Sequence, residues 1–350
     1  CRPVTGHAVA INARLSDGRF ALQTFKARDL LGLAVDGRGQ IETVADAPRF
    51  DFDLTATGQS LAGIGKAFPG VLPARADRDS KVALKGRVEG TLDNLRLIQS
   101  GEAGATAVSA TAELGFADKR LGQSGLLGMA ATVTARGRSF AAFADQWDVG
   151  LSAPAPADDG PFVLTADYRG MPRKADVDLK AELAGGVVSL AGSTRELRDT
   201  RTYEFELGVK SKDARAFARG IGFAVGNGGA PFGPLDLAAT VISGPQTIAF
   251  EQLNGRFGPV ELAGRLVLER AGERAVGRPR LTGEIKAGAL DLDRLFGDTA
   301  LVQNEHWSRD LWYFDRLARF DSDLRLTADS ITSHGFQFEH PQMTLVSDKG

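Results

Sequence analysis

Apolar and polar residues alternate along many short stretches of this chain, and this pattern constrains the fold more than any other feature. Phe50, Phe52 and Leu54 alternate with acidic and hydroxyl residues, and residues 82–88 and 260–268 repeat the same two-residue period. Successive side chains of a β-strand point to opposite faces of a sheet, so this period predicts strands with one apolar and one solvated face. The sequence therefore predicts a mainly β protein built from antiparallel strands.

The composition excludes several classes of protein. Glycine supplies 42 of the 350 residues, more than the usual share of about 7%, which suits a chain with many turns and strand ends. The formal net charge is −2, so no overall positive field exists to attract nucleic acid, and no nucleic-acid partner is expected. The single cysteine, Cys1, rules out an internal disulfide.

The sequence also contains a repeat much longer than the two-residue period. Segments that begin at Leu54, Val133, Leu207 and Ile285 align in one frame, so the unit recurs about every 75–80 residues. One position of this frame always holds a good helix N-cap, namely Ser60, Ser139, Asp213 and Asp291.

A short helix is predicted after each of these caps. In the second copy, Phe140, Phe143 and Trp147 have the spacing of one helix face. A loop rich in glycine or proline follows the first three helices, and a strand then returns near residues 82, 162 and 235. The predicted organisation is one continuous array: residues 1–48 as leading strands, repeat units over 49–127, 128–201 and 202–280, and a truncated C-terminal region over 281–350.

Three stretches resemble the AsmA family of bacterial envelope proteins. Residues 50–62 are similar to the family's step from strand to helix, and residues 281–296 are similar to its segment before the C-terminal region. Residues 307–338 are similar to that C-terminal region, in which a tryptophan, a short helix and a meander follow in order. The resemblance covers most of the chain from about residue 28, but the family's N-terminal transmembrane helix is absent and the meander stops early.

The resemblance implies an elongated, twisted antiparallel sheet curled into a groove that is related to lipid-transfer bridges. It also implies a location in the periplasm, with attachment to the inner membrane through the missing N-terminal anchor, and phospholipid carried toward the outer membrane. We therefore expect a fragment of a longer protein that supports outer-membrane integrity. Phospholipid acyl chains are the expected partner, and envelope proteins are further candidate partners.

Physical chemistry is compatible with this expectation, because an apolar sheet face needs a second layer and the predicted helices are only about 13 Å long. Acyl chains can supply that layer, whereas alternation alone also fits a closed sandwich or barrel core. The sequence is compatible with both an open groove and a closed core. The candidate groove residues are Phe50, Phe52, Leu54, Val82, Leu84, Phe162, Leu164, Phe205, Leu207, Leu235, Leu237, Val260, Leu262, Leu266, Leu268, Leu324 and Leu326.

No catalytic or metal-binding motif stands out, so neither an enzyme nor a cofactor is expected. The four histidines, at positions 7, 306, 334 and 340, form no zinc-binding motif. The carboxylate pairs at residues 51/53, 291/293 and 321/323 are interpreted as solvated faces or a helix start. Leu311, Phe314 and Ala318 have the spacing of a helix that lies on the sheet, and a membrane-interface belt of Trp307, Trp312, Tyr313 and Phe314 is the alternative.

Two other functions compete with lipid binding. The chain could act as a scaffold or assembly factor that holds outer-membrane proteins on its sheet without conducting lipid. A carbohydrate-active β-helix is the last alternative, but it needs a coil period of about 20–30 residues, far shorter than this repeat.

Overall fold

Strands dominate the protein. The computed structural model describes residues 6–43, 48–60, 81–116, 126–146, 160–171, 174–197, 200–221, 231–269, 278–296, 321–333 and 335–348, and strands make up 78% of them. The mainly β, mostly antiparallel prediction is thus confirmed. The chain divides into two compact units, residues 1–175 and 176–350, which we treat separately. The boundaries predicted for the repeat units stay a prediction.

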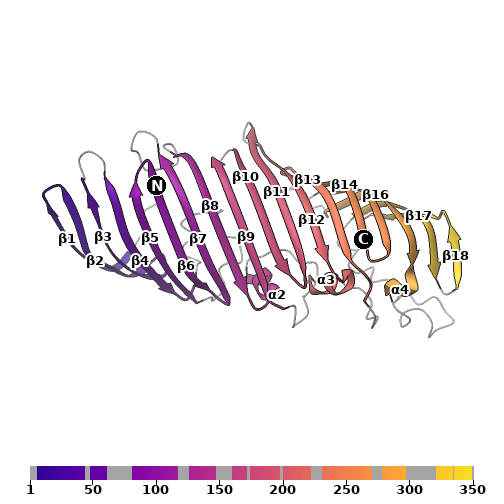
Figure 1. Cartoon of the computed structure of the whole chain (residues 1–350), viewed down its shortest axis with the longest axis horizontal. Helices are drawn as coiled ribbons and strands as arrows, with labels where there is room; N and C mark the ends of the chain where they lie inside the picture. The colour runs from indigo at the N-terminus through magenta and orange to yellow at the C-terminus, as the bar shows by residue number, and fades with distance from the viewer. Residues whose placement is uncertain are drawn as a thin grey trace. The chain divides into compact units, whose positions relative to one another are not determined.

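Unit 1 is an antiparallel meander in which each strand pairs with the next, from β1 to β9. Figure 1 shows these strands side by side in chain order. Within the described residues its elements are β1 (Gly6–Ser16), β2 (Arg19–Leu30), β3 (Leu33–Glu42), β4 (Arg49–Gly58), β5 (Val82–Thr91), β6 (Asn94–Ala103), β7 (Thr106–Phe116), β8 (Leu126–Gly137), α2 (Phe140–Gln146) and β9 (Phe162–Met171).

Unit 2 continues the meander from β11 to β16 and then changes direction. β16 pairs with β17 in parallel, and the other edge of β17 pairs with β18 and β19, each antiparallel to it. Its elements are β10 (Lys174–Leu183, which contains the unit boundary), β11 (Gly186–Leu197), β12 (Thr200–Ser211), α3 (Ala214–Gly220), β13 (Leu235–Ser243), β14 (Thr247–Phe257), β15 (Val260–Glu269), β16 (Arg280–Asp291), α4 (Leu292–Phe296), β17 (Asp321–Ser333), β18 (Phe336–Glu339) and β19 (Gln342–Ser347).

Tight turns explain why neighbouring strands are antiparallel. Asp17 and Gly18 between β1 and β2 have φ values of 49° and 71°, and Leu31 and Gly32 between β2 and β3 have 58° and 83°. Positive φ at both central residues belongs to the turns whose twist matches that of the flanking strands. Glycine adopts this conformation freely, whereas Leu31 is strained in it.

The helices begin where the sequence predicts caps. Ser139, Asp213 and Asp291 each accept a hydrogen bond from the backbone N–H three residues later, over 3.0, 3.3 and 2.9 Å. The returning strands also begin as predicted, because β5, β9 and β13 start at residues 82, 162 and 235. The first predicted helix falls within residues 61–80, outside the described residues, so a regular helix period stays a prediction. The predicted helix over 311–318 and two of the histidines, His306 and His334, also lie outside them.

Many of the best-buried apolar side chains lie at the helix end of the strands, and a second group, with Leu92, Leu95 and Phe116, lies at the other end of unit 1. In unit 1, Leu33, Val82 and Ala103 form one such cluster on neighbouring strands. In unit 2, Val260 and Ala287 begin another, which continues on β17. Among the described residues no helix is long and apolar enough to cross a membrane.

Candidate functional site

The strand register of unit 1 sorts its side chains onto two different faces. Cross-strand partners point to the same side of a sheet. Five rows of partners pass through Leu33, Val35, Gly37, Gly39 and Ile41 of β3, and we call these rows the apolar face of unit 1. No charged residue belongs to these rows in the described strands. The middle row runs from β3 to β9 through Gly37, Leu54, Gly86, Gln99, Ala110, Val133 and Ala166.

Unit 2 has an apolar face of the same kind. Its five rows pass through Tyr203, Phe205, Leu207, Val209 and Ser211 of β12, and its described strands place no charged residue in them. The row through Phe205 runs Gly192, Phe205, Val241, Phe250, Leu266, Gly283, Leu324 and Leu345. Alternation in the sequence predicts the apolar side of each strand separately. The pairing register shows that these sides lie next to one another in a single surface.

Every candidate groove residue from the sequence lies on one of these two apolar faces. Unit 1 carries Phe50, Phe52, Leu54, Val82, Leu84, Phe162 and Leu164. Unit 2 carries Phe205, Leu207, Leu235, Leu237, Val260, Leu262, Leu266, Leu268, Leu324 and Leu326. The sequence analysis missed the equivalent positions on β6, β7 and β8, such as Leu97, Val108 and Val133. Their small alanine and glycine neighbours weaken the apolar alternation there, although the two-residue period is present.

The middle of the apolar face of unit 1 is open in spite of its composition. Leu54 on β4 and Val133 on β8 are both 37% exposed, although each strand has paired neighbours on both sides. At the helix end of the same face, Val82 and Phe162 are only 2% exposed. The described part of the chain therefore buries this face at its helix end and around Leu95 at the opposite end, and it leaves Leu54 and Val133 at the centre partly exposed.

Helix α2 closes the helix end of unit 1. Phe140 and Phe143 of the helix pack against Phe162 of β9, with ring centroids 5.9 and 4.8 Å away. Gln146 Nε2 donates a hydrogen bond to the Ala103 carbonyl over 3.1 Å, which ties the last turn of the helix to β6. The helix has seven residues and packs against the ends of these strands.

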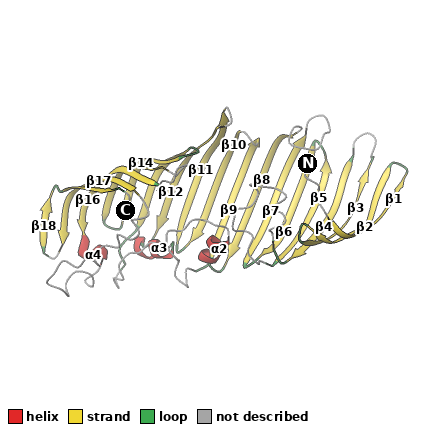
Figure 2. Ribbon diagram, turned by 180° about the vertical axis from the view of Figure 1, so that it is seen from behind, coloured by secondary structure: helices red, strands yellow, loops and turns green. Residues whose placement is uncertain are grey.

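Helices α3 and α4 close the same end of unit 2, and Figure 2 shows both at these strand ends. Phe217 of α3 and Phe232 before β13 are 3% and 2% exposed. The Arg215 guanidinium lies 5.1 Å from the centre of the Phe232 ring and donates a hydrogen bond to the Arg294 carbonyl of α4. This contact joins two helices 79 residues apart in sequence into one apolar cap.

The opposite face of each unit is charged. In unit 1, Arg87 pairs with Asp51 over 3.1 Å and Arg38 pairs with Asp53 over 3.5 Å. Both aspartate side chains are more than two-fifths exposed, at 44% and 48%, and such pairs contribute about 0–1 kcal/mol each. The structure thus places these carboxylates in cross-strand ion pairs on a solvated surface.

Glycines are frequent on the apolar faces, and some occupy backbone conformations closed to other residues. Gly101 on β6 has φ +153°, and a Cβ there would lie 2.0 Å from the Ala83 carbonyl oxygen. Gly255 on β14 has φ +138°, and a Cβ there would lie 2.0 Å from the Asp236 carbonyl oxygen. Glycines of this kind mark places where strands kink or approach closely.

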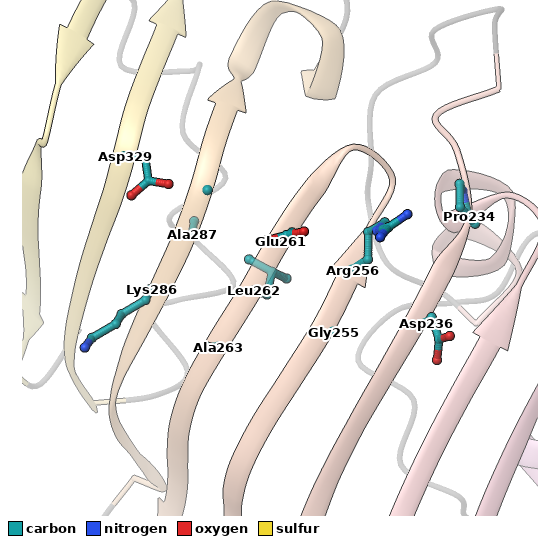
Figure 3. A pocket seen from close by; sticks show the side chains of 11 residues that line it. Pro234, Asp236, Gly255, Arg256, Glu261, Leu262, Ala263, Lys286, Ala287 and Asp329 are labelled. Atoms are coloured by element: carbon teal, nitrogen blue, oxygen red, sulfur yellow. The ribbon is translucent and has the colours of Figure 1, made fainter.

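A depression of 620 Å³ lies on the charged face of unit 2. Figure 3 shows one charged residue from each of five neighbouring strands around it: Asp236, Arg256, Glu261, Lys286 and Asp329. The two signs are intermixed, and the described residues contain no group of three or more side chains suited to a metal ion. Ligand pockets are mostly apolar with few polar groups, so the apolar faces are the better candidate site.

Comparison with models of protein families, with curated proteins and with solved structures finds no match to this chain. The resemblance to the AsmA family therefore stays a prediction. The candidate site rests on the register, the exposure of the apolar faces and the helix caps.

Proposed function

We propose that this protein holds or conducts phospholipid by accommodating acyl chains along its apolar faces, each the inner surface of a groove. The observation that carries the proposal is the open centre of the apolar face of unit 1, where Leu54 and Val133 remain 37% exposed on strands that have paired neighbours on both sides. Soluble proteins rarely leave a contiguous apolar surface of this extent uncovered, and such surfaces mark interaction sites.

An acyl chain suits this surface in shape and chemistry. Burying methylene groups contributes about 0.8 kcal/mol each, so about ten of them in contact supply about 8 kcal/mol before the cost of association. The rows contain no charged group that an acyl chain would have to desolvate. The apolar-face glycines support a concave surface, because kinks at such positions give sheets their curvature.

The cellular role of the proposal follows the AsmA resemblance. On this proposal the protein is part of a periplasmic bridge that is anchored in the inner membrane and passes phospholipid toward the outer membrane. Residues 307–338 carry the strongest part of that resemblance.

Site-specific photo-crosslinking tests the proposal in cells. A photo-reactive amino acid in place of Leu84, on the apolar face, should capture phospholipid. The same amino acid in place of the adjacent Lys85, which points to the charged face, should capture none. Equal labelling at the two positions, or no lipid at either one in repeated preparations, would count decisively against the proposal.

A scaffold for outer-membrane proteins is the second candidate. Its supporting observation is β1, which pairs only with β2 among the described strands and exposes Ile11 and Leu15 by 64% and 70%. Exposed edge strands can take up a strand from another chain. A photo-reactive residue in place of Asn12 on β1 would then capture protein, whereas lipid conduction requires lipid at Leu84.

A further inference from the structure

The apolar face of unit 2 differs from that of unit 1 at the strand ends away from the helices. The row through Tyr203 lies one row inside the register partners Glu196 and Arg201 of β11 and β12, and it contains hydroxyl residues on three adjacent strands: Thr194 on β11, Tyr203 on β12 and Ser243 on β13. We call these three residues the hydroxyl rim. The equivalent outer row of unit 1, through Ile41, has only apolar side chains or glycine from β1 to β9.

The hydroxyl rim is accessible to a ligand. All three side chains are half-buried, and the hydrogen bonds of the described residues include none from their hydroxyl groups. The Tyr203 ring stacks on Phe205 of the next row, with centroids 6.2 Å apart and planes 19° from parallel. Gly192 and Val241 flank Phe205 in that row, so the surface turns from polar to apolar within one step along the strands.

We infer that the hydroxyl rim binds the ester carbonyls of a diacyl glycerolipid whose chains run along unit 2 toward α3. This inference rests on the proposed function. The helix cap closes one end of the apolar face, so the polar part of an amphiphile belongs at the other end. Hydroxyl groups can donate hydrogen bonds to ester carbonyls, and the three rim residues include no cation that would select a phosphate instead.

Lipids that differ only in these carbonyls provide the test. Diacyl and dialkyl phosphatidylcholine carry the same headgroup and can carry the same chain lengths, but the ether-linked form has no carbonyl acceptor. With a photo-reactive residue in place of Leu207, two rows below the hydroxyl rim, half-saturation of crosslinking should need about tenfold more ether lipid than ester lipid. The same reporter at Leu54 of unit 1 should show no preference between the two lipids.

A triple variant with near-isosteric changes isolates the hydroxyl groups. Thr194→Val, Tyr203→Phe and Ser243→Ala together should remove the preference at Leu207 while ether-lipid crosslinking is retained. The matched control is Thr202→Val, which changes the residue next to Tyr203 on the charged face and should keep the preference. Circular dichroism should report the same fold for all variants.

The outcomes distinguish a failure of the hydroxyl-rim inference from a failure of the proposed function. Equal half-saturation by ester and ether lipid at Leu207, or a preference that survives the triple variant, would overturn the inference and leave the proposed function intact. Failure of both lipids to crosslink at either reporter would overturn the proposed function, and the inference with it.

Discussion

Replacing Leu54 by aspartate distinguishes an open apolar face from a closed core. Leu54 is 37% exposed, so roughly two-thirds of its burial free energy is lost, about 1–2 kcal/mol out of about 1.5–3 kcal/mol for a fully buried leucine. The new carboxylate keeps contact with water and avoids the larger penalty of an unpaired buried charge. The low strand preference of aspartate adds up to about 1 kcal/mol, which gives a total of about 1–3 kcal/mol.

Two companion variants calibrate this value. Val82→Asp changes a side chain that is 2% exposed within the cluster of Leu33 and Ala103, and it should cost about 4–5 kcal/mol or more. Thr55→Asp introduces the same residue next to Leu54 on the charged face, between Lys85 and Asp36, whose opposite charges offset each other, and it should cost about 1 kcal/mol or less. The Thr55 variant therefore removes strand preference from the comparison.

Urea unfolding followed by circular dichroism measures the three changes, and lipid crosslinking at Leu84 measures function in the same variants. We expect the order Thr55→Asp, Leu54→Asp, Val82→Asp in loss of stability. We also expect Leu54→Asp to remain folded with at least about tenfold weaker lipid capture. If Leu54→Asp lost as much stability as Val82→Asp, the middle of the face would be a sealed core and the reasoning would be wrong.

Three further predictions test other parts of the structure, each by the midpoint of urea or thermal unfolding. Gly101→Ala should destabilise the protein by about 2 kcal/mol or more, because Gly101 has a φ of +153° and the new Cβ would clash with the Ala83 carbonyl oxygen. The control is Gly128→Ala, whose new Cβ would have no atom within 4 Å, and this variant should be neutral or slightly stabilised. Asp213→Ala should cost about 1 kcal/mol through loss of the α3 N-cap, and Asp213→Asn should restore most of it; equal losses would contradict the capping role. Leu31→Asn should stabilise the protein by about 0.5–1 kcal/mol, because asparagine tolerates the φ of +58° that strains leucine. If the variant were less stable, the packing of the Leu31 side chain would contribute more than the backbone strain costs.

The sequence by itself determined the local structure of this protein. Alternation along Phe50, Phe52 and Leu54 predicted a strand because a two-residue period matches only the pleat of a sheet. Ser139, Asp213 and Asp291 predicted helix starts because their side chains satisfy backbone N–H groups a few residues away. These signals depend on neighbours in the chain, so they can be recognised without knowledge of the fold.

Only the tertiary structure decided how the strands combine into surfaces. The parallel pairing of β16 with β17 joins segments separated by the described helix α4 and by residues 297–320, and no local pattern specifies it. The openness of the apolar face around Leu54 likewise depends on which other segments cover it, and alternation is the same for a buried and an uncovered face. The hydroxyl rim exists because Thr194, Tyr203 and Ser243, up to 49 residues apart, fall into one row. Register is set by backbone pairing between distant residues, and that is why the structure was needed to find it.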